Sequence, residues 1–309
     1  MQKRMLLIMN PMAGQKRAAR YLADILRIFG EAEYECTVHM TRARGDGRAV
    51  ACARAADFSL IVCIGGDGTL NEVLSGLVES GADTPIGYIP AGSTNDFASS
   101  LGLSRNMLQA ARDIVGGTAC PLDIGRFNGR IFSYVASCGA FAKTSYSTPQ
   151  ANKNALGHLA YILEGIKDVG NLKQIHLRVQ PDNVTPVEGE FILAAVSNAT
   201  SIGGILTLDK QRVSMHDGKL ELLLLRYPKN LWELSRIVAS LQNQKYDDPL
   251  VTFVSAERFH LTMGEETPWT LDGEFGGAYT EADVEVCPSA VRWMLGKPHV
   301  TEALSSDPA

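Results

Sequence analysis

A glycine-rich stretch with one aspartate follows a fully apolar run of the chain. Leu60 to Ile64 is apolar throughout, which is typical of a strand buried on both faces in a parallel sheet. Gly65-Gly66-Asp67-Gly68-Thr69 comes next and leads into an apparent helix from Thr69 to Val78. Glycines let backbone N–H groups approach a ligand closely, and a helix N-terminus attracts phosphate. The stretch therefore predicts a nucleotide-phosphate site.

Asp67 lies in the middle of this predicted phosphate site, where a carboxylate is repelled unless a cation lies between. Mg²⁺ on a nucleotide is the natural cation, because it prefers oxygen ligands and keeps several of its waters. The alternative is a tight strand-to-helix turn with a polar cap. Because a buried strand precedes the motif and a helix follows it, we favour the nucleotide site.

Three further polar loops follow predicted strands in the same part of the chain. They are Asn10-Pro11-Met12-Ala13-Gly14, the segment Thr41 to Gly47, and Pro90-Ala91-Gly92-Ser93-Thr94-Asn95-Asp96. Alone, the first is an Asx-type turn and the last a helix N-cap. Ligands collect at the carboxyl ends of strands in doubly wound sheets. The joint pattern therefore predicts one shared edge that carries Asn10, Thr41, the Gly66–Thr69 loop and Thr94.

A second candidate carboxylate lies far away, in Leu271-Asp272-Gly273-Glu274. A lone Asp-Gly is most simply a hairpin turn. A phosphoryl-transfer enzyme, however, needs a carboxylate that takes the proton of the acceptor hydroxyl as the γ-phosphate arrives. We therefore assign Asp272 as the candidate general base and Glu274 as its support.

The elements that must position these residues change character near residue 122. Up to that point strands alternate with helices, which predicts an α/β doubly wound parallel sheet for residues 1–122. Beyond it, a hairpin signal at Asn128-Gly129 and a series of strands predict an antiparallel β-sandwich or flattened barrel for residues 123–290, with a cleft between the two domains. Helices are expected near Ala155–Val169 and Leu231–Leu241.

Composition limits the class of protein. The chain has 309 residues, 45% of them hydrophobic and 20% charged, and its net charge is −5. These values are ordinary for a soluble globular protein, and no apolar run approaches the roughly 18 residues that span a bilayer. The six cysteines show no metal-ligand spacing, so we expect reduced thiols and no zinc site. Residues 1–54 carry a charge of +5 and the remainder −10, a weak indication of phosphate or membrane contact.

Four motifs taken together resemble the catalytic domain of the diacylglycerol kinase family. They are Asn10-Pro-x-x-Gly14, Gly65-Gly-Asp-Gly-Thr-Leu-Asn-Glu72, Pro90-Ala-Gly-Ser-Thr-Asn-Asp-Phe97 and Leu271-Asp-Gly-Glu274, in this order along essentially the whole chain. The segments 144–150 and 156–161 look most like soluble bacterial members. Gly-Gly-Asp-Gly is shared with NAD kinases, whereas the Pro-Ala-Gly-Ser-Thr-Asn-Asp motif favours a lipid kinase.

The resemblance implies the site residues in more detail. It implies that ATP is bound by Asn10, Thr41, Thr94 and the loop motif with Gly65, Gly66, Gly68, Thr69 and Glu72, while Asp67 holds Mg²⁺ through water. It implies a C-terminal segment, residues 291–300, that returns to the first domain. A structural Mg²⁺ of some relatives would lie at Asp217, although Ser214 replaces the expected acidic ligand. Cys138-Gly-Ala-Phe also departs from the Gly-Phe-Asp of many relatives.

The predicted function is an ATP- and Mg²⁺-dependent lipid kinase that phosphorylates a lipid alcohol, with diacylglycerol as the first choice and phosphatidic acid as the product. An NAD kinase and a non-catalytic lipid-sensing protein on the same scaffold are the alternatives. We expect a cytoplasmic protein in peripheral contact with the inner face of the membrane. No nucleic-acid partner is expected. Family members are often dimers, so a homodimer stays open.

Overall fold

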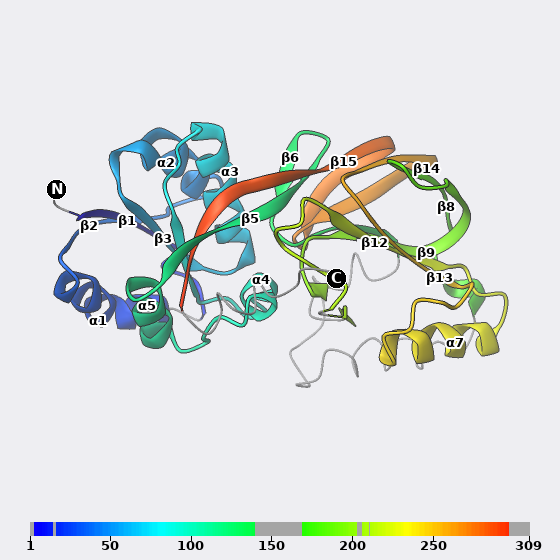
Figure 1. The fold of residues 1–309 in the computed structure, drawn as a ribbon, viewed down its shortest axis with the longest axis horizontal. Helices are drawn as coiled ribbons and strands as arrows, with labels where there is room; N and C mark the ends of the chain where they lie inside the picture. The colour runs from blue at the N-terminus through cyan, green and yellow to red at the C-terminus, as the bar shows by residue number, and fades with distance from the viewer. Residues whose placement is uncertain (1–2, 15–16, 140–168, 203–205, 210, 297–309) are drawn as a thin grey trace. The chain divides into compact units, whose positions relative to one another are not determined.

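The computed structural model describes residues 3–14, 17–139, 169–202, 206–209 and 211–296. These residues form two compact units (Figure 1). Unit 1 comprises residues 3–124 and 288–296, and unit 2 comprises residues 125–287. The helix predicted over residues 155–169 lies outside the described residues up to residue 168.

Unit 1 is a parallel sheet with helices on both faces. The strand order is β2-β1-β3-β4, and all three pairings are parallel. In Figure 1, α1 and α5 lie on one side of the sheet, and α2 and α3 lie on the other. The elements in chain order are β1 (Lys3–Met9), α1 (Arg17–Glu31), β2 (Tyr34–Met40), α2 (Asp46–Arg54), a 3₁₀ turn (Ala55–Asp57), β3 (Leu60–Gly65), α3 (Asp67–Ser80), β4 (Ile86–Pro90), α4 (Asp96–Ser100) and α5 (Met107–Val115).

The burial of these strands follows their sequences. Every residue of β3 and β4 is buried, as expected for central strands covered on both faces. Strand β2 lies at the edge of the sheet and is only partly buried, which explains its alternating sequence. Because all four strands are parallel, the loops that follow them meet at one end of the sheet, which we call the carboxyl edge.

Unit 2 is an antiparallel β-sandwich. Its strands are the C-terminal part of β5 (Thr118–Phe127), β6 (Arg130–Phe132), β7 (Val135–Gly139), β8 (Ile175–Pro181), β9 (Val187–Ser197), β10 (Ser201–Ile202), β11 (Leu206–Thr207), β12 (Leu220–Arg226), β13 (Val251–Ala256), β14 (Arg258–Leu271) and most of β15 (Glu274–Leu295); a 3₁₀ turn (Val169–Asn171) and α7 (Leu231–Gln242) complete it. Strands β9 and β14 each pair with β8 over one half and with β7 over the other. This exchange of partners lets the strands fold over a single core.

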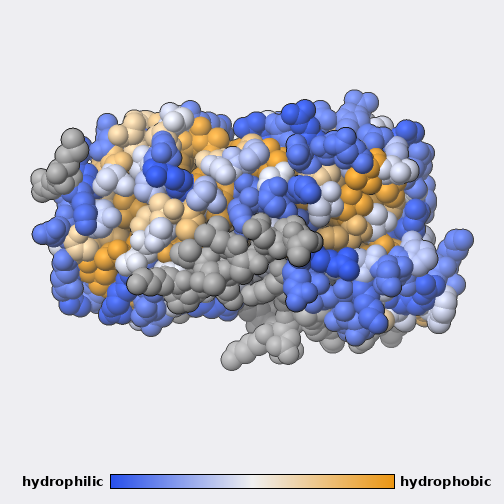
Figure 2. Space-filling model, in the orientation of Figure 1, coloured by the Kyte–Doolittle hydropathy of each residue, from blue (hydrophilic) through white to orange (hydrophobic). Residues whose placement is uncertain are grey.

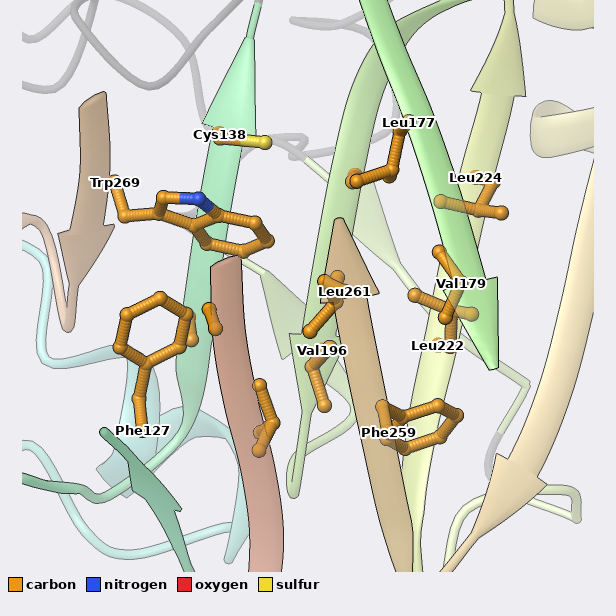
Figure 3. Close-up of a cluster of buried hydrophobic side chains, with 14 of the residues drawn as sticks. Phe127, Cys138, Leu177, Val179, Val196, Leu222, Leu224, Phe259, Leu261 and Trp269 are labelled. Atoms are coloured by element: carbon orange, nitrogen blue, oxygen red, sulfur yellow. The ribbon is translucent and has the colours of Figure 1, made fainter. Parts of the chain in front are cut away.

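The core of unit 2 contains side chains from strands that are distant in sequence. Figure 3 shows Phe127 of β5 and Trp269 of β14 facing each other, with their ring centroids 4.9 Å apart. Leu177 and Val179 of β8 lie opposite residues of β9 and β12 in the same cluster. These side chains are fully buried, so unit 2 has a hydrophobic core independent of the parallel sheet.

The chain returns to unit 1 through the last strand. Strand β15 runs for 22 residues, and Trp293 near its end pairs in parallel with Ile86 of β4. The Trp293 ring packs against Phe97 of α4 with a centroid distance of 4.5 Å. Within the described part of the chain, no helix is long and apolar enough to cross a membrane.

Candidate active site

The turn after β3 is built by close approach of backbones. Gly66 is the N-cap of α3 and has no side chain with which to cap the helix. A Cβ on Gly65 would lie 2.5 Å from Cβ of Thr69, so only glycine lets the helix turn this sharply. A Cβ on Gly92, in the loop after β4, would lie 2.6 Å from Cα of Gly66. The loops after β3 and β4 are therefore in direct backbone contact.

The loop after β1 is tied to the same turn. The Asn10 side-chain amide donates to Thr69 Oγ1 at 3.3 Å, and its carbonyl oxygen accepts from the Met12 N–H at 2.9 Å. The backbone N–H of Asn10 also donates to the Ile64 carbonyl at 3.0 Å. Thr41, at the start of the loop after β2, donates from its N–H to the Met9 carbonyl at 2.9 Å. The structure thus brings Asn10, Thr41 and Thr69 to the carboxyl edge.

Asp67 connects the turn of β3 to the helix that follows β4. Its two carboxylate oxygens lie 3.3 and 3.4 Å from the N–H groups of Asp96 and Phe97, the first residues of α4. The side chain of the α4 N-cap residue, Asn95, does not cap the helix. Asp67, which lies 29 residues before Asp96 in the chain, caps it instead. Asp96 is itself buried. Two acidic residues therefore adjoin at the carboxyl edge, and sequence reasoning selected only the first.

Tyr88 and Asn95 hold the loop after β4, and sequence reasoning selected neither. The Tyr88 hydroxyl donates to the Gly65 carbonyl at 3.1 Å and lies 3.3 Å from Oδ1 of Asn95. The Asn95 side chain closes the loop by two 2.9 Å bonds with the N–H and carbonyl of Gly92. Burial, and then the charges of Asp67, Cys63 and Asp96, raise the pKa of Tyr88 well above its usual value. Tyr88 therefore stays a neutral hydrogen-bond donor.

Thr94 lies in the same loop and is exposed. Glu72, one turn into α3, faces the loop after β2: its carboxylate accepts the N–H groups of Gly45 at 2.7 Å and of Gly47 at 3.2 Å. All the nucleotide-site residues predicted in the first domain therefore lie in the loops of the carboxyl edge or in the first turns of α3.

Asp272 lies in unit 2, in the two-residue turn between β14 and β15. Its φ of 49° and the φ of 80° at Gly273 are the left-handed values that a tight hairpin turn requires. The carboxylate accepts four hydrogen bonds: Oδ2 from the N–H and hydroxyl of Ser133 at 2.6 and 2.8 Å, and Oδ1 from the N–H groups of Tyr134 and Val135 at 2.9 and 3.1 Å. The side chain holds the turn between β6 and β7 in place.

The electrostatics of Asp272 result from opposing effects. Burial raises the pKa of Asp272 above its usual value, and the hydrogen bonds from Ser133, Tyr134 and Val135 oppose that rise. Only 5% of the residue is exposed. Glu274, two residues later on the same hairpin, is exposed, and so is the neighbouring Phe275, at 61%. The two predicted carboxylates therefore differ sharply in environment.

Asp217 is exposed in a turn that also contains the buried Ser214 and the half-buried His216. The Asp217 carboxylate accepts the Lys219 N–H at 3.1 Å, and the Ser214 hydroxyl lies 3.2 Å from Nδ1 of His216. Within the described ranges, no group of three or more His, Cys, Asp or Glu side chains is arranged to hold a metal ion. A structural metal at Asp217 stays a prediction.

Comparison with known proteins identifies the family. Residues 4–127 match the diacylglycerol kinase catalytic domain, and residues 135–295 match the YegS C-terminal NAD kinase beta sandwich-like domain. A diacylglycerol kinase of Bacillus subtilis (strain 168) is 35% identical over 278 residues, which are 89% of this chain and 91% of that protein. The chain belongs to the diacylglycerol kinase family. A diacylglycerol kinase of Staphylococcus carnosus is 30% identical over 280 residues, 90% of each chain.

Solved structures support the same fold. A crystal structure from Bacillus anthracis str. Sterne superposes with a TM-score of 0.78 at 25% identity and covers 96% of this chain and 98% of that chain. A second, of a diacylglycerol kinase from the same organism, has a TM-score of 0.76 at 22% identity over the same shares of both chains. The predicted family resemblance and the predicted fold class are confirmed.

Proposed function

We propose that this protein is an ATP- and Mg²⁺-dependent lipid kinase that transfers the γ-phosphoryl group to the hydroxyl of diacylglycerol and so forms phosphatidic acid. The observation that carries the proposal is the joined set of loops at the carboxyl edge, where Gly66 and Gly92 touch and Asp67 bridges to α4. Membership of the diacylglycerol kinase family supports the choice of a lipid acceptor.

The helix termini at the carboxyl edge favour one place for the phosphates. The N-terminus of α2 is capped by Glu72 and that of α4 by Asp67. Helix α3 begins after Gly66, which has no side chain to cap it, and Asp67 in its first turn turns its carboxylate to the start of α4. The positive end of the α3 dipole therefore favours a phosphate. We therefore assign the phosphates of ATP to the Gly66–Thr69 loop, next to Asn10, Thr41 and Thr94.

The Asp67 carboxylate at this edge fits a magnesium ion that accompanies a nucleotide. It lies beside the Gly66–Thr69 loop, where its oxygens accept the N–H groups of Asp96 and Phe97, and carboxylate oxygens are the ligands that Mg²⁺ prefers. When bound, Mg²⁺ neutralises negative charge on the phosphoryl oxygens. Asp67→Asn should therefore weaken binding of the metal and the nucleotide together, whereas the fold of unit 1 should survive.

In the proposed mechanism, Asp272 accepts the proton of the lipid hydroxyl, and Glu274 supports it. All four lone-pair positions of Asp272 already accept hydrogen bonds, so one donor has to move before a substrate hydroxyl can bind there. Three of the donors are backbone N–H groups, and the fourth is the hydroxyl of Ser133, which can turn away without a change of the backbone. We propose that the substrate hydroxyl takes the place of the Ser133 hydroxyl.

The substrate lies in a membrane, so the proposal includes peripheral contact with the inner face of the membrane. Exposed apolar side chains are available for such contact among the described residues, the largest exposed fractions being those of Trp232 at 66%, Met12 at 65% and Phe275 at 61%. On the face drawn in Figure 2, hydrophobic residues are interspersed with hydrophilic ones. Membrane contact and a homodimer stay predictions, because an assay of phosphate transfer measures neither of them.

The test is transfer of labelled γ-phosphate from ATP, with Mg²⁺, to a panel of diacylglycerol, sphingosine, ceramide, monoacylglycerol and NAD. Label in phosphatidic acid from the wild-type protein supports the proposal, and its loss in an Asp67→Asn variant whose fold and loops are shown to be intact supports the role of Asp67. Label in another lipid keeps the mechanism and changes the acceptor. Label only in NADP favours the NAD kinase alternative, which the NAD kinase-like sandwich of residues 135–295 makes worth including. No transfer at all favours the non-catalytic lipid-sensing protein.

A further inference from the structure

Glu72 lies on the face of α3 that packs against α2, and its carboxylate points at the loop after β2. Oε1 accepts the N–H of Gly45 at 2.7 Å, and Oε2 accepts the N–H of Gly47 at 3.2 Å. The side chain is half-buried. Both oxygens are thus engaged by backbone donors 25 and 27 residues away in the chain.

Helix α2 needs this contact because it cannot cap itself. Its N-cap residue is Gly45, which adopts φ 85° and has no side chain to accept the first N–H groups. Glu72 supplies the missing acceptor from a different helix, and its negative charge faces the positive end of the α2 dipole. The contact also leaves little space, since a Cβ on Gly47 would lie 3.1 Å from Oε2.

A second acidic side chain holds the other end of the same loop. The Asp46 carboxylate accepts the Arg42 N–H at 2.8 Å and lies 3.2 Å from Nε2 of His39. The hydrogen bond from Arg42 and then the one from His39 lower the pKa of Asp46. Residues 41–47 are therefore fixed by Asp46 from within and by Glu72 from α3, the helix that begins at the phosphate loop.

We propose that Glu72 is a positioning residue, which holds the Thr41–Gly47 loop in its nucleotide-binding conformation and does not itself contact the nucleotide. Both carboxylate oxygens are occupied by the loop, and a negative side chain repels phosphates. The inference rests on the proposed function, because it assigns Thr41 to the ATP site. Through the first turns of α3, Glu72 links the Thr41–Gly47 loop to the Gly66–Thr69 loop.

The test compares Glu72→Gln with Glu79→Gln. Glu79 also lies on α3 and also contacts α2, where it accepts Nε of Arg48 at 2.9 Å, but it lies away from the loop. Amide hydrogen exchange of residues 41–48 is measured without nucleotide. Exchange should speed up about ten- to a hundredfold in Glu72→Gln, as expected for weakened bonds to a charged acceptor, and should stay near wild type in Glu79→Gln.

Steady-state kinetics provide the second readout. In Glu72→Gln the KM for ATP should rise about tenfold while kcat stays within about threefold, because the loop affects binding rather than the transfer step. Gly47→Ala disturbs the same contact from the loop side, and it should also raise the KM for ATP, but by less than Glu72→Gln does. It also serves as the second variant if Glu72→Gln does not fold.

Two results would overturn the inference. One is exchange of residues 41–48 that is no faster in Glu72→Gln than in Glu79→Gln. The other is a loss of kcat at unchanged KM, which would place Glu72 in the chemistry. Failure of the proposed function looks different: wild-type protein would transfer no phosphate, whereas the exchange comparison would still decide whether Glu72 holds the loop.

Discussion

Substitution of Asp272 by Asn should destabilise the protein as well as affect its chemistry. The sequence alone leads to the expectation that Asp272→Asn slows the reaction about 10²–10⁴-fold with little effect on folding. The structure changes the second part of that expectation, because the carboxylate accepts four hydrogen bonds in a buried turn. Asn tolerates the positive φ of this position as well as Asp does, so the backbone itself is not penalised.

The magnitude follows from counting donors. The single carbonyl oxygen of Asn can still accept the N–H groups of Tyr134 and Val135, and the Ser133 hydroxyl can turn to accept from the new amide. The backbone N–H of Ser133 then faces another donor, which costs about 1–3 kcal/mol for an unsatisfied buried group. Replacing a charged acceptor by a neutral one weakens the remaining bonds, but the raised pKa of Asp272 means that relief from burying the charge offsets this. The net loss should therefore be that of the unsatisfied N–H group, about 1–3 kcal/mol.

The assay is equilibrium unfolding followed by tryptophan fluorescence, since Trp269 is buried three residues away on β14. The melting temperature should fall by roughly 2–12 °C for a unit of this size. Glu274→Gln is the matched control, because it removes an exposed charge from the same hairpin and should change stability by less than about 0.5 kcal/mol. If Asp272→Asn unfolds within about 0.5 kcal/mol of wild type and of that control, the reasoning is refuted.

A double-mutant cycle sharpens the same prediction. Ser133→Ala removes the hydroxyl donor alone and should cost about 1 kcal/mol. In the Asp272→Asn background the same substitution should cost measurably less, because the charged acceptor is already gone. Strict additivity would mean that Ser133 and Asp272 do not stabilise each other.

Three smaller predictions concern the loops and the pH dependence. Tyr88→Phe should lose about 1 kcal/mol in thermal unfolding, because one buried hydroxyl hydrogen bond disappears; no change would mean that the contact with Asn95 is dispensable. Gly92→Ala should raise the KM for ATP at least tenfold, because a Cβ there meets the backbone of Gly66, and unchanged ATP binding would contradict the shared loop geometry. Since burial raises the pKa of Asp272, the native state binds a proton more tightly than the unfolded chain, whose Asp titrates near 3.9. The stability contributed by this group should therefore fall as pH rises from about 4 through the folded pKa. The transfer rate should fall below that pKa, because the protonated carboxyl group can no longer accept the substrate proton. Both pH dependences should be absent in Asp272→Asn.

The parallel sheet could be predicted because its strands carry an unambiguous pattern. Leu60 to Ile64 is apolar throughout, and the observed strand β3 covers it with one residue more. Apolar and polar residues alternate over Tyr34–Met40, which indicates a half-buried strand, and the structure places β2 at the sheet edge with the same bounds. Since parallel strands end at one edge, the shared position of the loops followed from the topology alone.

The long strands of unit 2 could not be predicted in full. A strand pattern can be recognised in the sequence only over Arg258–Met263 and Ala282–Val286, whereas β14 continues to Leu271 and β15 begins at Glu274. The β14–β15 pairing shifts register twice, between Thr262 and Thr267 and between Trp269 and Thr270. Each irregularity breaks the period-two pattern by which a strand is recognised.

Side-chain roles at the site were the least predictable feature, and three carboxylates show why. Asp67, Glu72 and Asp272 each accept N–H groups from a segment that is distant in sequence: the start of α4, the start of α2 and the turn between β6 and β7. A sequence shows where an acidic residue lies but not which backbone N–H groups bond to it in the fold. A carboxylate in a motif is therefore interpreted as a ligand for a metal or a substrate. In the fold it is also the cap that fixes a loop. A substitution at any of the three therefore perturbs loop geometry together with chemistry, and a loss of activity identifies a catalytic group only after unfolding and exchange have shown that the loop is intact.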